Sequence, residues 1–347
     1  GLNPEQLAAV TLPAVPALIL AGAGSGKTRV LTTRIAWLLS TGQVSPGGVL
    51  AVTFTNKAAK EMLTRLTSML PVNVRGMWIG TFHGLCNRFL RAHWKFAGLP
   101  QGFQILDASD QVAAVKRVVK AMALDEERYP PKQAAYFISG SKEEGLRPHD
   151  ITPPDPHTAK LIEVYAAYEA QCQREGVVDF GELMLRCYEL MRDNDAVREH
   201  YRRRFAHVLV DEFQDTNKLQ YKWLQMFAPP EPQKGVFAVG DDDQSIYAFR
   251  GAQVGNMADF EREYRVPQVI KLEQNYRSYA HILDAANALI AHNTKRLGKN
   301  LRTDAGSGEP VRVFEATSDY GEAQWLLDEA QQLHRGGMAR SQVAILY

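Results

Sequence analysis

Residues 17–28 of the chain read ALILAGAGSGKT, an apolar run that enters a loop with three glycines and ends on a lysine and a threonine. Leu31, Ile35 and Leu38 follow at helical spacing and share one face. A strand, a glycine-rich turn and a helix in this order form the first part of a βαβ unit, whose two strands lie parallel. This stretch limits the fold to α/β arrangements more strongly than any other part of the sequence.

Further short apolar runs predict more strands. They lie at residues 49–54, 77–82, 207–212 and 235–241. None of them alternates apolar and polar residues, which is typical of strands buried on both faces of a parallel sheet. Helical patterns, such as residues 58–69, separate the runs. The sequence therefore predicts a doubly wound α/β sheet.

The interval between the third and fourth runs has a different character. Residues 107–183 show helical periodicity, including an apolar stripe over 112–122, and contain no strand-like run. The Pro- and Gly-rich residues 139–157 predict a long turn region. We expect an all-helical subdomain inserted into a sheet domain made of residues 1–106 and 184–275.

Residues 276–347 predict the start of a second α/β domain. A helix is expected over residues 278–293, a strand over 311–318, a helix after Asp319 and a strand over 342–347. Because the last predicted strand ends at the last residue, we expect this unit to be incomplete, with a last strand that lacks neighbours and presents an unpaired edge.

The net charge of +1 hides an asymmetry along the chain. Residues 1–106 carry ten Lys and Arg against two Glu, or +8, whereas the remainder carries 30 basic against 37 acidic residues, or −7. Such a division fits either a polyanion-binding face or an ordinary solvated surface. The composition is that of a globular protein, and the three cysteines form no CxxC pair, which indicates reduced thiols rather than disulfides or zinc. Without a long apolar run or a secretion signal, we expect a cytoplasmic protein with no membrane contact.

Residues 21–28, AGAGSGKT, match the Walker A pattern of phosphate-binding loops, with Ala21 in place of the usual first glycine. In such a loop the backbone N–H groups surround phosphate oxygens at the positive end of a helix. Lys27 is expected to reach the β and γ phosphates, and the Thr28 hydroxyl to ligate Mg²⁺.

The fourth apolar run ends in two acidic residues, Asp211 and Glu212. A magnesium nucleotide needs an acidic group at the tip of a strand near the phosphate loop, and Asp211 is expected to hold the ion. Glu212 is expected to orient and deprotonate water. The second acid favours a hydrolase over a kinase, because a hydrolase must activate water rather than a substrate hydroxyl.

Two more residues fit the same chemistry. Gln244 follows the fifth apolar run, where its amide could sense the γ-phosphate or the attacking water. Arg277, in the segment LEQNYRS, could neutralise charge on the transferred phosphoryl group. Taken singly, a capping glutamine and a surface arginine are the simpler interpretations.

Together these motifs resemble those of superfamily 1 DNA helicases of the UvrD, Rep and PcrA type. The matching segments, in the family's order, are LNPEQLAAV, AGAGSGKTRV, AVTFTNKAAKEM, GTFHGL, VDEFQDTN, VGDDDQSIYAFRGA and LEQNYRS. The inserted segment, with LPQGFQILD and EEGLRPH, resembles the UvrD members. The resemblance implies a RecA-like P-loop NTPase sheet with an inserted helical subdomain and an incomplete second RecA-like domain.

The resemblance also implies an activity. Its members are ATP-driven motors that move 3′ to 5′ along single-stranded DNA and unwind duplex at single-strand/double-strand junctions. ATP and Mg²⁺ are the cofactors implied, and mismatch- and excision-repair proteins are the protein partners implied.

The resemblance extends to nucleotide-binding residues. Gln6 matches the glutamine that reads adenine, for which one amide offers both a donor and an acceptor, and Tyr276 matches the tyrosine that stacks on the base. The loop supplies the rest of the implied nucleotide site: Ala21, Gly22, Ala23, Gly24, Ser25, Gly26, Lys27, Thr28 and Arg29.

A third group of residues resembles the positions at which this family contacts the DNA strand. These are Phe54, Asn56, His83, Tyr247, Phe249 and Arg250. Aromatic rings stack on bases of any sequence, and basic groups contact phosphates. Core packing is the alternative for Phe54, which lies at a strand end. Many relatives have Trp where this chain has Phe249, so the stacking area is smaller here.

The family's later motifs, including a second arginine directed at the γ-phosphate, do not occur in these 347 residues. We therefore expect ATP binding with weak hydrolysis and no robust unwinding. Two alternatives are a nucleotide-dependent single-stranded DNA-binding module and the motor subunit of a helicase–nuclease of the RecB or AddA kind. A P-loop kinase or GTPase is disfavoured, because no guanine-reading NKxD motif follows.

Overall fold

The computed structural model describes residues 1–347 and contains a six-stranded sheet in which every pair of neighbours is parallel. In spatial order the strands are β3 (Trp78–Thr81), β2 (Val49–Thr53), β6 (His207–Val210), β7 (Gly235–Gly240), β1 (Ala17–Ala21) and β8 (Val269–Leu272). The predicted α/β class and the five predicted strands are confirmed, and β8 is an additional edge strand that the sequence analysis missed.

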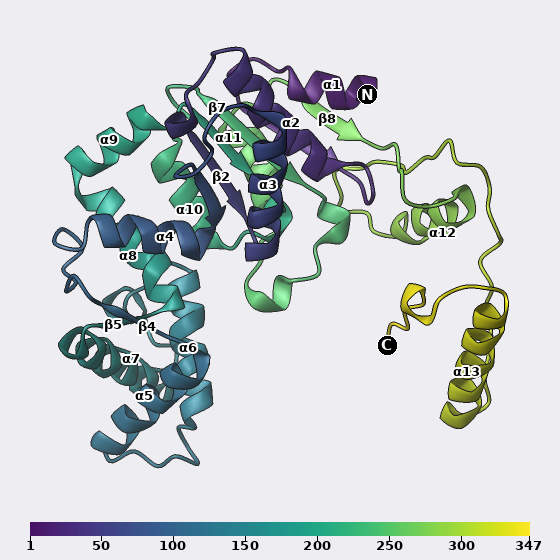
Figure 1. Ribbon diagram of the computed structural model, residues 1–347. Coiled ribbons are helices and arrows are strands. Elements are labelled where there is room, and N and C mark those ends of the chain that lie inside the picture. Colours follow the sequence, from purple (N-terminus) through teal and green to yellow (C-terminus); the bar gives the residue numbers. More distant parts are fainter.

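Helices cover both faces of this sheet (Figure 1). On β1, Leu18 and Leu20 pack into one core cluster and Ile19 into the other, as expected for strands buried on both faces. One face packs against α1 (Pro4–Val10), α2 (Lys27–Ser40) and α3 (Asn56–Met69). The other packs against α4 (Phe82–Ala92), α8 (Phe180–Asp193), α9 (Asp195–Arg204), α10 (Lys218–Phe227) and α11 (Gly255–Glu263).

The inserted segment has a small core of its own, formed by α5 (Ala108–Ala121), α6 (Pro131–Glu143) and α7 (Pro156–Glu175). Two details correct the sequence analysis. The segment predicted over 107–183 is not wholly helical, because it contains β5 (Val177–Asp179), which pairs in parallel with β4 (Gln104–Leu106) just before the segment. The predicted turn region begins too early, because α6 continues to Glu143. The proposed domain boundaries at 106/107 and 183/184 stay predictions.

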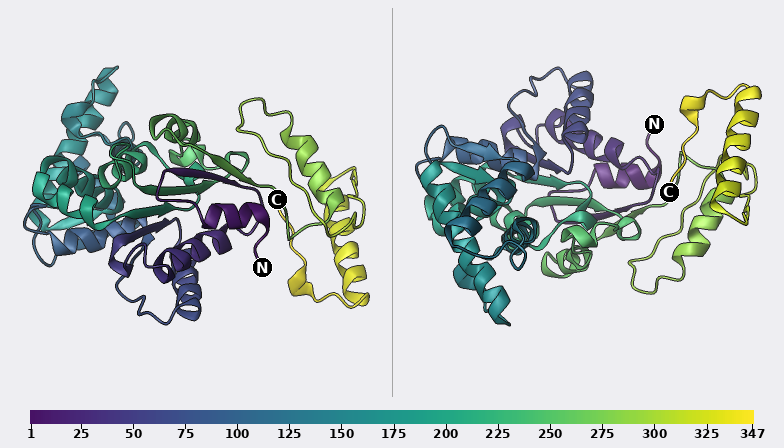
Figure 2. Two further views of the ribbon diagram at one scale, coloured as in Figure 1. Left: turned by 90° about the horizontal axis from the view of Figure 1, so that it is seen from above. Right: turned by 90° about the horizontal axis from the view of Figure 1, so that it is seen from below.

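The C-terminal part carries two helices, α12 (Ala280–Ile290) and α13 (Asp319–Arg335), and no residue beyond Asn300 is buried. The strands predicted over 311–318 and 342–347 are wrong. Val313 and Leu346 are each 94% exposed, so these runs have no neighbouring strand to supply hydrogen bonds or packing. Figures 1 and 2 show α13 apart from the sheet.

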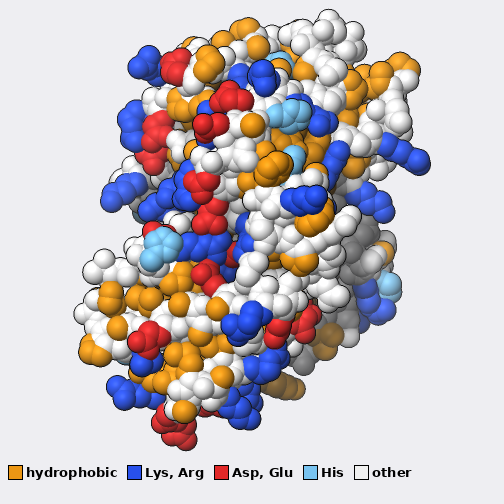
Figure 3. All heavy atoms as spheres, turned by 90° about the vertical axis from the view of Figure 1, so that its left-hand side faces the viewer, with side chains coloured by type: hydrophobic (Ala, Val, Ile, Leu, Met, Phe, Trp, Pro, Cys, Tyr) orange, Lys and Arg blue, Asp and Glu red, His pale blue; other side chains and the backbone are white.

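Basic and acidic side chains are interspersed on the face seen in Figure 3, which is the left-hand side of Figure 1. The positive charge of the first 106 residues therefore does not form a field of one sign on this face. No helix of the chain has both the length and the apolar character needed to cross a membrane.

Candidate functional site

The phosphate-loop sequence lies between β1 and α2, as its pattern predicts, and β1 lies between β7 and the edge strand β8. Gly24 and Gly26 have φ angles of +64° and +79°, in the left-handed region that glycine adopts without steric cost. Their N–H groups donate to no backbone carbonyl. The first N–H groups of α2 lack partners within the helix as well, so the loop and the helix end present a set of free donors to an anion.

Lys27, the first residue of α2, forms an ion pair with Glu212, which follows β6. The fold thus brings together the predicted phosphate lysine and the predicted base. Glu212 has a φ of +49°, in the left-handed region, and its N–H donates to Asp211 Oδ1 at 2.8 Å. Asp211 is 6% exposed, and burial together with the nearby Glu212 raises the pKa of Asp211 to about 6.

Gln214 was not identified from the sequence, yet it connects the two acidic segments of the site. Its side chain is 1% exposed, donates from Nε2 to Glu212 Oε2 at 2.7 Å and accepts at Oε1 from the Asp241 N–H at 3.0 Å. A buried amide that is bonded at both ends fixes the distance between its partners. The only feature of the sequence that could have identified Gln214 is its position between Glu212 and Asp215.

Gln244 lies in the segment that follows β7, within reach of the same network. Its Nε2 donates to Asp241 Oδ2, and Asp241 itself is 2% exposed. A continuous set of side-chain and backbone contacts therefore runs from Lys27 through Glu212 and Gln214 to Asp241 and Gln244.

The predicted adenine-binding residues lie on the other side of the loop. Gln6 is 2% exposed; its Oε1 accepts from the Asn3 N–H at 3.0 Å and its Nε2 donates to the Ser25 carbonyl at 2.9 Å. Asn3 also donates to the Tyr276 hydroxyl at 2.7 Å, and the Tyr276 N–H donates to the Gly24 carbonyl at 2.9 Å. The two residues are neighbours of the loop, and each end of the Gln6 amide makes one bond, which leaves a second N–H and a second lone pair without a partner.

Arg277 is exposed beside the loop, where its Cβ lies 2.8 Å from the position that a Cβ on Gly24 would take. Its N–H donates to Asn275 Oδ1 at 2.8 Å, and its guanidinium makes no hydrogen bond or ion pair within the protein. The guanidinium is therefore available to an anion on the loop, and its role there stays a prediction.

The phosphate loop and the network from Lys27 to Gln244 together form the phosphate edge of the sheet. Its residues fit a nucleotide bound with magnesium. The Ser25 hydroxyl is buried without a hydrogen-bond partner, and it lies within the phosphate loop. Thr28 offers a further hydroxyl in the first turn of α2 and Asp211 a carboxylate, which are oxygen ligands of the kind that Mg²⁺ prefers.

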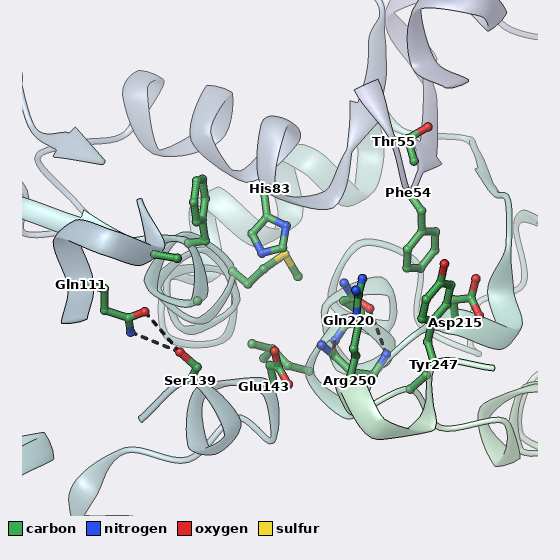
Figure 4. A pocket seen from close by; sticks show the side chains of 17 residues that line it. Phe54, Thr55, His83, Gln111, Ser139, Glu143, Asp215, Gln220, Tyr247 and Arg250 are labelled. Atoms are coloured by element: carbon green, nitrogen blue, oxygen red, sulfur yellow. Dashed lines mark hydrogen bonds between the residues drawn. The ribbon is translucent and has the colours of Figure 1, made fainter. Parts of the chain in front are cut away.

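A cavity of about 660 Å³ opens between the sheet domain and the inserted helices (Figure 4). Four residues predicted to contact DNA line it: Phe54, His83, Tyr247 and Arg250. The opposite wall comes from the insertion, through Gln111 of α5 and Ser139 and Glu143 of α6. The cavity is open to solvent and has mixed polar and aromatic walls, which suits a chain of bases and phosphates better than a compact apolar ligand.

The other two predicted contacts lie outside this cavity. Phe249 is 69% exposed and lines an adjoining cavity of about 1000 Å³, which shares Arg250 and Glu143 with the first. The Arg250 guanidinium carbon lies 5.1 Å from the ring centroid of Tyr247 and 5.4 Å from that of Phe249, so one cation faces both rings. Asn56 is exposed at the start of α3 and lines neither cavity.

Phe180, the first residue of α8, is an aromatic wall residue that the sequence analysis missed. It is 48% exposed, and its ring lies edge-on to His83 with centroids 6.1 Å apart. Burial lowers the pKa of His83, an effect opposed by Asp179. The imidazole is therefore neutral at pH 7 and presents an aromatic ring rather than a charge to the cavity.

Asp215 belongs to both regions of the site. It lines the 660 Å³ cavity, and burial together with Glu212 raises the pKa of Asp215 to about 6. The phosphate edge and the cavity are therefore close enough for a carboxylate of one to influence a carboxylate of the other.

Comparison with known proteins places these features in a family. The sequence profile described as UvrD/REP helicase N-terminal domain matches residues 2–265, and the profile described as UvrD-like helicase C-terminal domain matches residues 270–347. DNA helicase II of Salmonella typhimurium is 51% identical and that of Escherichia coli 50% identical, each over 348 residues that cover 100% of this chain and 48% of the relative. ATP-dependent DNA helicase PcrA of Leuconostoc citreum is 42% identical over 351 residues, covering 100% of this chain and 47% of the relative. The chain spans about half the length of these curated relatives.

Proposed function

The chain belongs to the UvrD/REP helicase family, and on that premise we propose that it carries the ATP-hydrolysing face of a motor that moves 3′ to 5′ along single-stranded DNA. The observation that carries the proposal is the side-chain network from Lys27 to Gln244. The same segment that holds Gln244 goes on to Tyr247 and Arg250 in the cavity wall. One short stretch of chain thus belongs both to the phosphate edge and to the aromatic groove, which consists of the 660 Å³ cavity and the adjoining cavity that Phe249 lines.

In this proposal the phosphate loop and Lys27 hold the β and γ phosphates of ATP, and Thr28 and Asp211 hold Mg²⁺. The magnesium ion neutralises phosphate charge when bound. Glu212 accepts a proton from the attacking water, whose oxygen forms the new bond to the γ-phosphorus while the bond from that phosphorus to the β,γ-bridging oxygen breaks and ADP leaves with the bridging oxygen. Gln244 orients that water and Arg277 stabilises the charge on the transferred phosphoryl group.

Glu212 must leave its ion pair with Lys27 to act as the base. Both side chains are partly exposed, at 22% for Lys27 and 28% for Glu212, so neither is locked by packing. A γ-phosphate competes for the lysine with more charge than one carboxylate carries, which releases Glu212 toward the water.

We propose that the cavity binds single-stranded DNA by stacking, with Phe54, Tyr247 and Phe180 against bases and Arg250 against phosphate. Single-strand/double-strand junctions and repair proteins are the further partners proposed from the family resemblance. Because the chain spans about half of its relatives, duplex unwinding is assigned to the longer protein rather than to these residues.

Steady-state ATP hydrolysis by the chain, with and without single-stranded DNA, tests the proposal. We expect magnesium-dependent turnover that DNA stimulates and that Glu212→Gln removes, whereas Glu309→Gln, at an exposed position, leaves it unchanged. ATP and DNA binding without any turnover would instead assign a nucleotide-dependent DNA-binding module. Failure to bind ATP would contradict both assignments.

A further inference from the structure

Lys299 lies beyond LEQNYRS (272–278), the last of the segments that match the family. Its ammonium group nevertheless reaches the segment that carries Gln244. Resting on the proposed function, we propose that Lys299 is a positioning residue that sets the orientation of the Gln244 amide and thereby the response of the site to the γ-phosphate.

The Lys299 side chain is the buried counter-charge of the acidic segment after β7. It is 6% exposed as a residue, and its Nζ donates to Asp241 Oδ1 and to Asp243 Oδ2, the latter at 2.7 Å. Asp243 has a second partner in Arg296, whose Nε and Nη2 donate to it at 2.8 and 2.6 Å. Asp241 has no other cation, so Lys299 alone neutralises it.

Asp241 in turn determines which end of the Gln244 amide faces the nucleotide. Its Oδ2 accepts from Gln244 Nε2 while its Oδ1 accepts from Lys299. An ionised carboxylate only accepts hydrogen bonds, so the amide must turn its NH₂ group toward Asp241. Gln244 Oε1, which no protein group donates to, is left as the acceptor presented to a water molecule.

Lys299 also contacts the phosphate loop itself. Its Cε lies 3.4 Å from the position that a Cβ on Gly22 would take, and the Leu301 side chain is packed against the same point. The tip of the lysine, Cε and Nζ, therefore lies beside the loop and the Gln244 segment at once. A residue in this position transmits a shift of one part to the other.

The removal of this ammonium group has a specific expected consequence. Asp241 would lose its counter-charge, turn toward other donors and release Gln244 Nε2, after which either end of the amide can face the phosphate. In the proposed function the β-phosphate is held by the N–H groups of the loop and by Lys27, and Lys299 hydrogen-bonds none of these groups. The loss should therefore appear in the recognition of the γ-phosphate and not in the binding of ADP.

The experiment measures dissociation constants of Mg·ADP and of a non-hydrolysable Mg·ATP analogue for the chain and its variants. In Lys299→Met, which keeps the length of the stem, we expect the preference for the ATP analogue over ADP to fall about tenfold, the size of one charge-assisted hydrogen bond, with ADP affinity unchanged. Lys299→Arg should restore the preference. Lys295→Met removes an exposed lysine that makes no ion pair, and should leave the preference unchanged.

Asp241→Asn provides a second route that does not remove a buried cation. It should lower the same preference, and the double variant with Lys299→Met should lose no more than either single variant, because both act through one contact. An unchanged preference in folded Lys299→Met or in Asp241→Asn overturns the inference, and so does a wild-type chain that binds both nucleotides equally. A wild-type chain that binds neither nucleotide overturns the proposed function itself, which separates the two failures.

Discussion

The phosphate edge and the groove are neighbours, but they are built on opposite principles. At the phosphate edge, buried polar groups bond one another: Gln214, Asp241 and Lys299 are each at most 6% exposed and each is paired. In the groove, aromatic rings such as Phe180 and Phe249 are exposed by 48% and 69% and bond nothing. Chemistry on phosphate requires fixed positions, whereas a track that admits any base requires accessible faces. The difference predicts that mutations in the two regions have separable effects.

The largest separable effect is expected for Lys27→Ala. It removes the cation at the β and γ phosphates, so ATP turnover should fall by about 10²-fold or more, the range seen when one preorganised charge-stabilising donor is lost. The affinity for single-stranded DNA without nucleotide should stay within about twofold. Turnover assays and fluorescence anisotropy with a labelled oligonucleotide measure the two quantities. Equal losses in both would break the division between edge and groove.

A change in the groove should have the reverse pattern. Tyr247→Ala and Phe54→Ala are expected to weaken single-stranded DNA binding by about 5- to 100-fold each, since a base–aromatic stack contributes about 1 to 3 kcal/mol. Binding of Mg·ADP should not change. Phe96→Ala is the matched control, because this ring is 66% exposed and does not line the cavity. If the Phe96 variant loses as much DNA affinity as the others, the cavity is not the track.

The backbone of the phosphate edge should tolerate a methyl group poorly. In Gly24→Ala the new Cβ would lie 2.7 Å from Asn275 Nδ2 at a φ of +64°, so steric contact adds to backbone strain, and ADP affinity should fall about tenfold. Gly42→Ala has a φ of +71° but meets nothing within 4 Å, so it isolates the strain alone. Calorimetric titration with ADP should show a loss in the first variant only.

The smallest effect concerns Asp215, which the two regions share. Its pKa in the folded chain, about 6, is above its ordinary value of 3.8. The folded state thus binds the proton more tightly than the unfolded state, a stabilisation that is complete below pH 3.8 and is lost as the pH rises through 6. Relative to Asp215→Asn, the free energy of unfolding of the wild-type chain should therefore decrease from pH 4 to pH 7. Urea unfolding at several pH values measures this difference; a constant or increasing value would contradict the assigned environment.

Features that depend on local sequence were predicted well. The phosphate loop needs two glycines at positive φ between a strand and a helix, and the sequence of the loop itself shows them. A strand buried on both faces is apolar without alternation, and a run of four to eight residues is enough to show this. The strands expected over 311–318 and 342–347 failed because strand propensity produces a strand only beside a partner.

Features that depend on distant contacts were not predictable from the sequence. Gln214 and Lys299 matter because folding brings Asp241 to both of them, across 27 and 58 residues respectively. The β4–β5 pair has three residues per strand, which is too short for a periodic pattern. Phe180 is one aromatic among many until the fold places it beside His83.

The central claim is that residues 241–250 join the nucleotide site to the groove, and one measurement tests it directly. The affinity for a labelled single-stranded oligonucleotide is measured with no nucleotide, with Mg·ADP and with a non-hydrolysable Mg·ATP analogue, in the wild-type chain and in Gln244→Ala. We predict that the ATP analogue changes DNA affinity at least about fivefold relative to ADP in the wild-type chain, within the usual range of coupling between two sites, and that the change disappears in the variant. An identical nucleotide response in Gln244→Ala, with both ligands still bound, would contradict the claim.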